Sequence, residues 1–476
     1  MIGRQKEIEK VKQLLSSERP EFLAVTGRRR VGKTYLIDAL LGKNFCFSMT
    51  AIQNGTTKTQ LTNFNIKLSE YDGTSTHKVA ENWQMAFQQL KIYLKTLDKS
   101  QKRVIFIDEL PWAAIPKSGF IQMLAHFWND YLSKESHFIL VICGSATSWI
   151  TQKIINDTGG LHNRVTENIH LYPFTLSETA LFLKSKGLQF SANDIAKIYM
   201  SLGGIPFYLD NIKKGESFSA AIERLCFSTT GILYNEYNNL YQALFNNAEV
   251  HQNIVAALAM RQYGATHADI LQQLGLKQPT GSYQRAIEEL VISDFLTETT
   301  PFGKVKRGVV YRLTDEYSVF YHRFIKSNKK YVSGIWQQLA EEQTYKIWTG
   351  YAFETLCHKH IEPIKKALGI SAVFTKIYSL NIAATTESEG LQIDLIIDRK
   401  DGCINLCEIK FHGSPFTITK DYYQKQLEKR QRFIDFTGTK KQVFLTFITN
   451  HGIAPNVYSA EILDAEIRLE QLFEGV

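Results

Sequence analysis

Long hydrophobic runs are missing from this chain of 476 residues. The longest, residues 138–143 (FILVIC), has the length of one strand, whereas a helix that spans a bilayer needs about 20 apolar residues. Residues 1–15 (MIGRQKEIEKVKQLL) also lack the apolar stretch of a secretion signal. We therefore expect a cytoplasmic protein that does not contact a membrane.

Cysteine is scarce and shows no metal-binding spacing. The sequence has no CxxC pair, and no cysteine has a His-rich neighbourhood of the kind that zinc sites use. The pattern favours buried, reduced thiols over disulfides or a zinc site. The six cysteines are Cys46, Cys143, Cys226, Cys357, Cys403 and Cys407.

Size and charge set the remaining bounds. A chain of this length should divide into about three or four domains, and a hydrophobic content of 44% can fill their cores. The net charge of +8 is modest, so it permits a polyanionic partner without requiring one. In residues 420–441, Lys and Arg alternate with Tyr and Phe on an expected helix. This segment is either a solvated helix face or a contact surface for nucleic acid.

Residues 22–40 (FLAVTGRRRVGKTYLIDAL) combine a short apolar strand, a glycine-rich loop of spacing GxxxxGKT and a helical pattern. The glycines let the loop curl so that its backbone N–H groups face phosphate oxygens, and the helix dipole adds a positive end. Lys33 would reach the β- and γ-phosphates, and the Thr34 hydroxyl would ligate Mg²⁺. The nucleotide-binding residues expected here are Gly27, Arg28, Arg29, Arg30, Val31, Gly32, Lys33, Thr34 and Tyr35.

A second apolar strand, residues 103–110 (RVIFIDEL), ends in two carboxylates. Asp108 would hold Mg²⁺ through water, and Glu109 would polarise the water that attacks ATP. Together with the glycine-rich loop, this pair predicts a site for ATP and Mg²⁺.

Two further polar residues follow in the same region. Ser145, at the end of an apolar strand over 137–146, either senses the γ-phosphate or forms a turn. Arg164 is a candidate arginine finger, which would act on a neighbouring subunit of a homo-oligomer, or else a surface ion-pair residue.

These motifs resemble those of AAA+-type ATPases, and more narrowly the branch shared by archaeal-type ATPases, origin-recognition proteins and STAND signalling ATPases. The resemblance covers about residues 1–245. Residues 2–11 (IGRQKEIEKV) look like the N-terminal box of that family, in which Arg4 and Glu7 border the adenine site, and residues 203–209 (GGIPFYL) are similar to the GGxP motif of its helical lid. The resemblance implies a parallel sheet of five strands flanked by helices, with nucleotide at the carboxyl ends of the strands.

Residues 248–313 show three short helical patterns, over 249–260, 266–276 and 282–296, followed by strand, turn and strand. Thr266 is expected to cap the second helix and Gly275 to end it.

This layout resembles a winged helix-turn-helix, for which two uses stay open: reading DNA, or acting as a rigid spacer that packs on the ATPase. The DNA-reading residues would be Gln278, Thr280, Ser282, Tyr283 and Arg285 near the start of the third helix, with Lys304, Lys306 and Arg307 on the wing.

Residues 391–411 (LQIDLIIDRKDGCINLCEIKF) read as two apolar strands around a turn, yet they carry Asp394, Glu408 and Lys410. A buried charge costs several kcal/mol unless a partner or a metal compensates it. A three-residue KDG loop with Gly402 in the left-handed conformation would place Asp394 directly opposite Glu408. Lys410 would then share their face, because strand side chains alternate. A two-residue turn would instead move Asp394 to the other face.

Clustered carboxylates of this kind have a chemical use. They repel each other unless a cation lies between them, and Mg²⁺ takes such oxygen ligands. A nearby lysine can orient an attacking water or help to deprotonate it. The spacing D-x13-E-x-K, with a Glu upstream in residues 350–361, resembles the PD-(D/E)xK nuclease superfamily. On that resemblance, the catalytic residues are Glu354, Asp394, Glu408 and Lys410, and the metal ligands are Asp394, Glu408 and the carbonyl of Ile409.

The fusion of these parts resembles archaeal-type ATPases whose C-terminal part is known as DUF234. It implies an α/β protein with a P-loop ATPase core, a helical lid, a winged helix-turn-helix and a restriction-endonuclease-like α/β domain. The predicted function is an Mg²⁺-dependent ATPase that controls a nuclease-like domain acting on DNA. The alternatives are an ATP-dependent signalling switch or a DNA-tethering protein, with a non-catalytic C-terminal domain. The predicted boundaries are 1–175 for the core, 176–245 for the lid, 246–325 for the winged helix, 326–345 for a linker helix and 346–476 for the nuclease-like domain.

Overall fold

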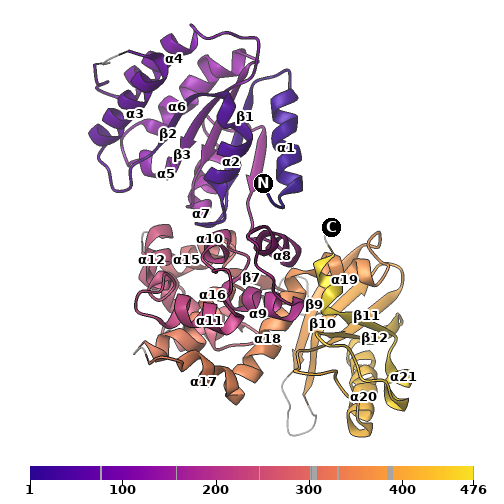
Figure 1. Ribbon diagram of the computed structural model, residues 1–476. Helices are drawn as coiled ribbons and strands as arrows, with labels where there is room; N and C mark the ends of the chain where they lie inside the picture. Colours follow the sequence, from indigo (N-terminus) through magenta and orange to yellow (C-terminus); the bar gives the residue numbers. More distant parts are fainter. Residues whose placement is uncertain are drawn as a thin grey trace. The chain divides into compact units, whose positions relative to one another are not determined.

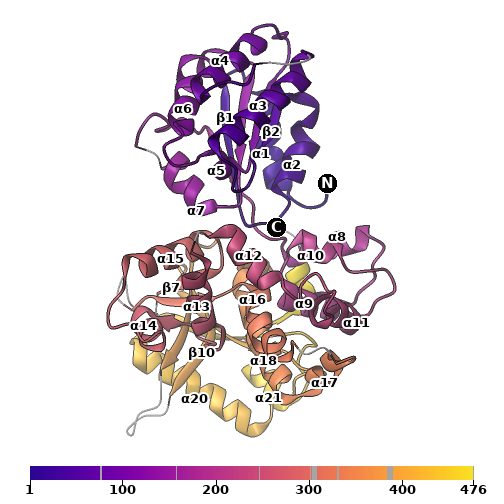
Figure 2. The same ribbon diagram turned by 90° about the vertical axis from the view of Figure 1, so that its left-hand side faces the viewer.

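The computed structural model forms two compact units, Met1–Pro173 and Phe174–Val476, which Figures 1 and 2 show in two views. The division falls at Pro173, against a predicted end of the ATPase core at residue 175. Within the part of the chain that the structure describes, no helix is both long and apolar enough to cross a lipid bilayer. The described residues are 1–74, 78–156, 158–245, 247–300, 302, 308–329, 332–382 and 390–474.

The first unit is a five-stranded parallel sheet with helices on both faces, as the resemblance predicted (Figure 1). The strand order is β2-β3-β4-β1-β5. The strands are β1 (Glu21–Thr26), β2 (Phe45–Thr50), β3 (Arg103–Asp108), β4 (Phe138–Cys143) and β5 (Glu167–His170). The helices are α1 (Gln5–Ser16), α2 (Lys33–Leu41), η1 (Gly42–Asn44), α3 (Thr57–Asp72), α4 (Trp83–Leu94), α5 (Leu110–Ala113), α6 (Phe120–Asp130), η2 (Leu132–Lys134), α7 (Thr147–Ile150) and η3 (Thr151–Ile155).

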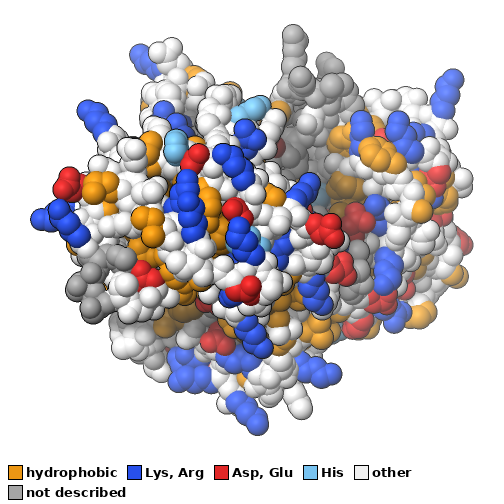
Figure 3. All heavy atoms as spheres, turned by 90° about the horizontal axis from the view of Figure 1, so that it is seen from above, with side chains coloured by type: hydrophobic (Ala, Val, Ile, Leu, Met, Phe, Trp, Pro, Cys, Tyr) orange, Lys and Arg blue, Asp and Glu red, His pale blue; other side chains and the backbone are white. Residues whose placement is uncertain are grey.

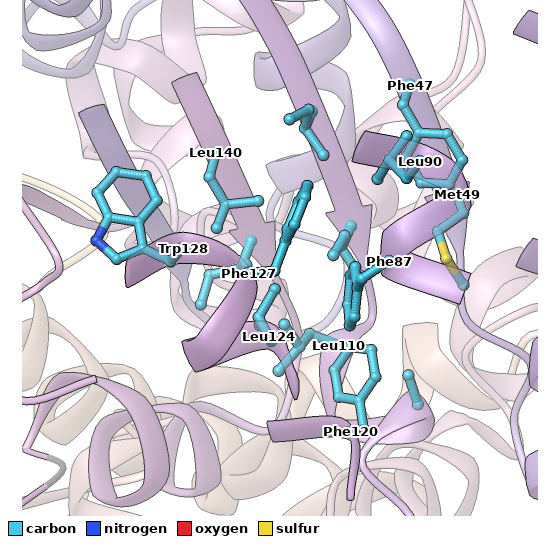
Figure 4. Packing of buried hydrophobic residues seen from close by; sticks show 14 of the residues in the cluster. Phe47, Met49, Phe87, Leu90, Leu110, Phe120, Leu124, Phe127, Trp128 and Leu140 are labelled. Atoms are coloured by element: carbon cyan, nitrogen blue, oxygen red, sulfur yellow. The ribbon is translucent and has the colours of Figure 1, made fainter. Parts of the chain in front are cut away.

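Two apolar layers cover this sheet, one on each face. Phe22 and Ala24 of β1 pack with α3, α4 and α6, whereas Leu23 and Val25 pack with α1 and α2. Figure 4 shows the first layer, where Phe127 and its neighbours from α6 lie against the strands and against side chains of α4. Because both faces are covered, every residue of β4 is buried, which explains its unbroken apolar sequence.

The second unit contains mostly helices at its start and a larger sheet at its end. Its helices are α8 (Leu176–Ser185), α9 (Ala192–Leu202), α10 (Pro206–Asp210), α11 (Phe218–Ile222), η4 (Glu223–Phe227), α12 (Glu236–Leu244), α13 (Ala248–Ala259), α14 (His267–Gln273), α15 (Gly281–Ile292), α16 (Glu316–Phe320), η5 (Tyr321–Ile325), η6 (Lys326–Asn328), α17 (Ile335–Glu341), α18 (Gln343–Lys359), α19 (Ile361–Ala367), α20 (Lys420–Thr437), α21 (Val457–Ile462) and η7 (Leu469–Phe473). Its strands are β6 (Ala265–Thr266), β7 (Leu296–Thr299), β8 (Val310–Leu313), β9 (Thr375–Ile382), β10 (Leu391–Arg399), β11 (Cys403–Lys410), β12 (Gln442–Thr449) and β13 (Ala465–Arg468).

Helices α13 to α15 and the small sheet β6-β8-β7 occupy the region expected to hold three helices and two strands. The predicted cap is confirmed, because the Thr266 side chain accepts a hydrogen bond from the Asp269 N–H. The predicted end of α14 is confirmed too, since Gly275 has a left-handed φ of 69°. The third helix is shorter than predicted: it ends at Ile292, and Asp294 turns the chain with a φ of 61° before β7 begins.

The proposed DNA-reading residues of this region separate into two groups. Tyr283 does not suit the DNA-reading alternative, because it is only 1% exposed and its hydroxyl forms a hydrogen bond with His267 Nδ1 at 3.1 Å. The others on α15 and the loop before it are exposed: Gln278, Thr280, Ser282 and Arg285. The wing residues Lys304, Lys306 and Arg307 lie outside the described residues.

The described part of residues 326–345, a segment predicted as a linker helix, is packed into the second unit. The Trp336 ring is fully buried and stacks on Phe227 at a centroid distance of 5.6 Å. It also meets the ring of Tyr345 edge-on, and its backbone N–H donates to Glu223 at 2.8 Å. This segment is therefore part of the core of the second unit.

The C-terminal sheet has the order β13-β12-β11-β10-β9, with antiparallel pairing from β9 to β11 and parallel pairing from β11 to β13. The predicted hairpin register is confirmed, because Leu395 pairs with Cys407 and Asp398 with Ile404. Gly402 closes the three-residue loop with a left-handed φ of 83°. The two acids of the hairpin therefore face each other across neighbouring strands.

Charge is mixed across the surface that Figure 3 displays. Lys and Arg side chains there are interspersed with Asp and Glu side chains and with apolar patches. The net charge of +8 is consistent with this mixture.

Candidate functional site

The loop between β1 and α2 has the curled backbone that its glycines predicted. Gly27 and Gly32 have φ values of 136° and 91°. A Cβ atom on Gly27 would lie 2.4 Å from the carbonyl oxygen of Leu171, so this position requires glycine for space as well as for conformation. The loop leads directly into α2, whose first residue is Lys33. The amino end of α2 therefore faces the loop, as an anion site requires.

Lys33 and the residues around it line this loop. The buried Lys33 ammonium donates to the carbonyl oxygens of Gly27 and Arg28 at 2.9 and 2.8 Å. Arg4, predicted to border the adenine, is buried and donates to the Val31 carbonyl at 3.3 Å. The structure thus brings Lys33 and Arg4 onto the same loop. The other predicted loop residues differ in solvent exposure. Arg28 is buried and Arg29, Arg30 and Gly32 are half-buried, whereas Thr34 and Tyr35 are exposed.

The ends of β3 and β4 bring the predicted acids and Ser145 together. Thr34 Oγ donates to Asp108 Oδ2 at 2.9 Å, which joins the two expected magnesium ligands. Glu109 Oε2 accepts from both the N–H and the hydroxyl of Ser145, at 3.1 and 3.0 Å. A hydroxyl and a carboxylate are oxygen donors of the kind that Mg²⁺ binds, so the residues present fit this ion.

Arg164 lies apart from these contacts in the described part of the first unit. It is exposed on the turn before β5, where its N–H donates to the Leu161 carbonyl at 3.0 Å. Its role as an arginine finger stays a prediction.

A second cluster of charged groups lines one cavity of about 910 Å³ in the second unit. Its acids are all buried: Asp394 is 6% exposed, Glu408 8% and Glu354 7%. Lys410 and Ile409 line the same cavity. The structure therefore brings together all five residues predicted for this site.

Asp394 owes its direction to an irregularity in β10. The pairing of β10 with β9 shifts register between Ile393 and Ile396, and such a bulge re-aims the side chain it contains. Asp394 Oδ2 accepts from the Ile409 N–H at 3.1 Å, and Oδ1 accepts from Gln392 at 3.2 Å. One carboxylate oxygen is thus anchored to the neighbouring strand.

Glu408 is held by cations and by a phenol. Its Oε1 accepts from Lys410 at 2.6 Å and from the Tyr422 hydroxyl at 2.8 Å, and its Oε2 accepts from Lys429 at 2.6 Å. Sequence reasoning missed Tyr422 and Lys429, although it noted the basic helix that became α20. Their separation of two helical turns places them on one face, a signal that could have selected them.

Arg312, also missed, reaches this site from β8. Its guanidinium donates to Thr355 Oγ at 3.0 Å and lies 3.9 Å from Glu354 Oε2. The ring of His358 bonds to the backbone carbonyl of Asp394 at 2.9 Å. No sequence motif marks Arg312 or His358, because each reaches the site only when segments distant in the sequence fold together.

Burial and neighbouring charges divide the acids into two kinds. Burial, with the Asp394 carboxylate, raises the pKa of Glu354 to about 8, although Arg312 and Lys410 oppose the rise. Burial and the charge of Glu408 also raise the pKa of Asp394. For Glu408, burial works against ionisation, but the ammonium groups of Lys410 and Lys429 outweigh it and lower the pKa to about 2. At neutral pH, Glu354 therefore keeps its proton and Glu408 is ionised.

These residues can bind a divalent cation only if the cation replaces the ammonium groups that Glu408 now contacts. Asp394 and Glu408 supply carboxylate oxygens of the kind that Mg²⁺ takes. Among the described residues, however, no three His, Cys, Asp or Glu side chains are already grouped as a metal site. A cation bound here would take the place of the lysine ammonium groups on Glu408.

Comparison with known proteins supports the first of the two sites. Residues 1–212 match a family described as an ATPase domain predominantly from Archaea. This part of the chain is similar to archaeal-type ATPase domains. An uncharacterized protein of Methanocaldococcus jannaschii is 23% identical over 452 residues, covering 92% of this chain and 95% of that protein.

One solved structure shows the same fold. A Walker-type ATPase of Pyrococcus abyssi superposes with a TM-score of 0.52 at 17% identity, covering 68% of this chain and 96% of its own. The ORC2 protein of Aeropyrum pernix is also similar, with a TM-score of 0.43 and 12% identity over 71% of this chain and 95% of its own. The likeness to the Pyrococcus ATPase shows that the ATPase fold is present.

Proposed function

We propose that this protein hydrolyses ATP with Mg²⁺ and uses the nucleotide state to control a metal-dependent phosphodiesterase site that acts on DNA. The ATPase part rests on the pairing of Thr34 with Asp108 and of Glu109 with Ser145. The phosphodiesterase part rests on one observation: Glu354, Asp394, Glu408 and Lys410 line a single cavity.

In the ATPase site, this chain's residues bind phosphate and prepare water. Lys33 exchanges its bonds with loop carbonyls for bonds with phosphate oxygens, which are stronger because both partners are charged. Thr34 and Asp108 would hold Mg²⁺, which offsets the charge that develops on the phosphates. Ser145 fixes one oxygen of the Glu109 carboxylate, so that Glu109 can orient the attacking water.

In the second site, Asp394 and Glu408 would hold a divalent cation together with the carbonyl of Ile409. That cation would polarise the scissile phosphate. Lys410, once released from Glu408, lies beside the reacting phosphate and can orient a water molecule. Glu354 keeps a proton at neutral pH, so it can donate a hydrogen bond to the substrate or to water.

One observation favours a second candidate function. Both oxygens of Glu408 are already engaged by Lys410, Lys429 and Tyr422, and this network is complete without a metal. A site built in this way suits a non-catalytic binding module in an ATP-dependent signalling switch. Such a module would also suit a DNA-tethering protein.

A plasmid assay separates these functions. The full chain is incubated with supercoiled plasmid and Mg²⁺, without nucleotide, with ATP or with ADP, and the nicked and linear products are measured. We expect Glu408→Gln to abolish cleavage. The control is Glu428→Gln. Glu428 is an exposed residue of α20 outside the cavity, so this variant should cleave plasmid at the parent rate.

Two outcomes would count against the proposal. Absence of Mg²⁺-dependent product under every nucleotide condition removes the phosphodiesterase part. Calorimetry with Mn²⁺ in the absence of nucleotide then identifies the alternative. If the C-terminal domain is a non-catalytic module, the parent and the Asp394→Asn variant should give the same Mn²⁺ titration, because no ion binds at Asp394.

A further inference from the structure

The cavity that contains Asp394 and Glu408 is a cleft with helix α18 along one wall. Gln343, Lys346, Gly350 and Glu354 line it, and their spacing of three or four residues places them on one face of the helix. The helix rises about 17 Å from Gln343 to Glu354, so the cleft is at least about that long.

The cleft is narrow for its length. A volume of about 910 Å³ spread over about 17 Å has a mean cross-section of about 55 Å²; because this is the space open to the centres of water-sized molecules, the free width between the walls is about 11 Å. The two grooves of a B-form duplex are about 8.5 and 7.5 Å deep, so the duplex is at least about 16 Å across. A duplex is therefore wider than the cleft, whereas one extended strand fits.

The other wall is fixed in place by hydrogen bonds. Asn193 and Lys197 of α9 line the cleft, and Asn193 Oδ1 accepts from the Asn450 side chain at 3.1 Å. The Leu176 N–H, at the start of α8, donates to His360 Nε2 at 2.8 Å. These contacts attach α8 to the end of α18 and α9 to the residue that follows β12.

The side chains in the cleft suit an unpaired strand. Lys197, Lys346 and Lys410 place ammonium groups along it, where they can contact successive phosphates. Tyr351 and Phe411 line the same cleft and offer ring faces on which bases can stack. A basic groove with interleaved aromatic rings is the usual arrangement for binding single strands without sequence preference.

We propose that the cleft takes a single unpaired DNA strand, so that the substrate of the Asp394–Glu408 site is single-stranded or frayed DNA. A continuous duplex is wider than the cleft and would contact only its open mouth. This inference rests on the proposed function and specifies the substrate of the same site.

The test measures binding without cleavage. A fluorescent oligonucleotide of mixed sequence is presented to the full chain either single-stranded or annealed to its complement, in an Asp394→Asn background without divalent metal. Fluorescence anisotropy should show at least about tenfold tighter binding of the single strand. Lys197→Gln and Lys346→Gln should each weaken that binding about threefold to tenfold and lower the slope of log affinity against log salt by about 0.7.

Lys184→Gln is the matched control, because Lys184 is an exposed lysine of α8 outside the cleft. Binding of duplex as tight as that of the single strand overturns the inference, and so does equal behaviour of the Lys197, Lys346 and Lys184 variants. Failure of the proposed function can be told apart from failure of this inference. If the protein binds single strands but does not cleave DNA, the proposed phosphodiesterase activity is refuted and the inference about the cleft stands.

Discussion

At the end of β3, Glu109 adopts a left-handed backbone conformation with φ 49°, which is unfavourable for a residue other than glycine. Two hydrogen bonds from Ser145 hold its carboxylate in that position. The strained backbone turns Glu109 away from the line of β3, whereas Asp108 just before it bonds to Thr34. Two adjacent acids thus serve different partners.

Glu109→Gln should keep ATP binding and lose hydrolysis by about 10²- to 10⁴-fold, because an amide cannot accept the proton of the attacking water. Equilibrium binding of a fluorescent ATP analogue and phosphate release measure the two properties. Lys33→Ala serves as the contrast, since it should lose binding itself. Hydrolysis at the parent rate in Glu109→Gln would show that another group activates the water.

Glu354 should give the second unit a distinctive pH dependence. Its pKa is about 8 in the folded chain against an ordinary value of 4.5, so between these values the unfolded chain loses a proton that the folded chain keeps. This contribution to stability is therefore complete below pH 4.5 and is lost as the pH rises to about 8, by about 5 kcal/mol at most.

Urea unfolding at pH 5 and pH 8 tests this expectation. Glu354→Gln should lose less stability than the parent between the two pH values, because glutamine does not titrate. The exposed Glu428→Gln should follow the parent. Parallel losses in all three proteins would mean that Glu354 titrates near its ordinary pKa.

At the scale of elements, the β10–β11 hairpin was the part of the second unit most open to prediction. A three-residue loop and period-two alternation placed Asp394, Glu408 and Lys410 on one face, and the register agrees. Local rules sufficed because the two strands are adjacent in sequence. The bulge at Asp394 could not be predicted in the same way, since it depends on pairing with β9.

Gly402→Ala should destabilise the second unit by about 1–2 kcal/mol, because alanine disfavours the left-handed φ of 83°. A Cβ atom there would meet no atom within 4 Å, so the cost is conformational only. Gly413→Ala is the control, since its Cβ also meets nothing and its φ lies outside the left-handed range. Equal losses of unfolding free energy in urea would refute this explanation.

At the scale of the whole molecule, the ATPase fold followed from the sequence, and so did the acids and the lysine of the second site, whereas the remaining walls of that site did not. The GxxxxGKT loop and the acids after β3 are local signals in a sheet of known order. Arg312 and the α9 wall come from segments far apart in the sequence. No periodicity or spacing connects such segments, so only the folded chain could show that they meet.

The second unit should fold as one body that cannot be shortened to the predicted C-terminal domain. Residues 174–476 should unfold cooperatively in urea. A fragment of residues 346–476 should be much less stable, because it loses the Leu176 contact of His360 and the rings of Phe320 and Phe324 that pack against Trp348 in the intact unit. Similar unfolding free energies for the two fragments would contradict this.

Arg312 gives β8 an influence beyond its own small sheet. The positive charge of this strand residue lies 3.9 Å from Glu354 and opposes the rise in its pKa. A displacement of β8 away from Glu354 by an ångström or two would raise the pKa of this acid further, and a displacement toward it would lower the pKa. The acidity of Glu354 thus depends on the position of a strand that belongs to another sheet.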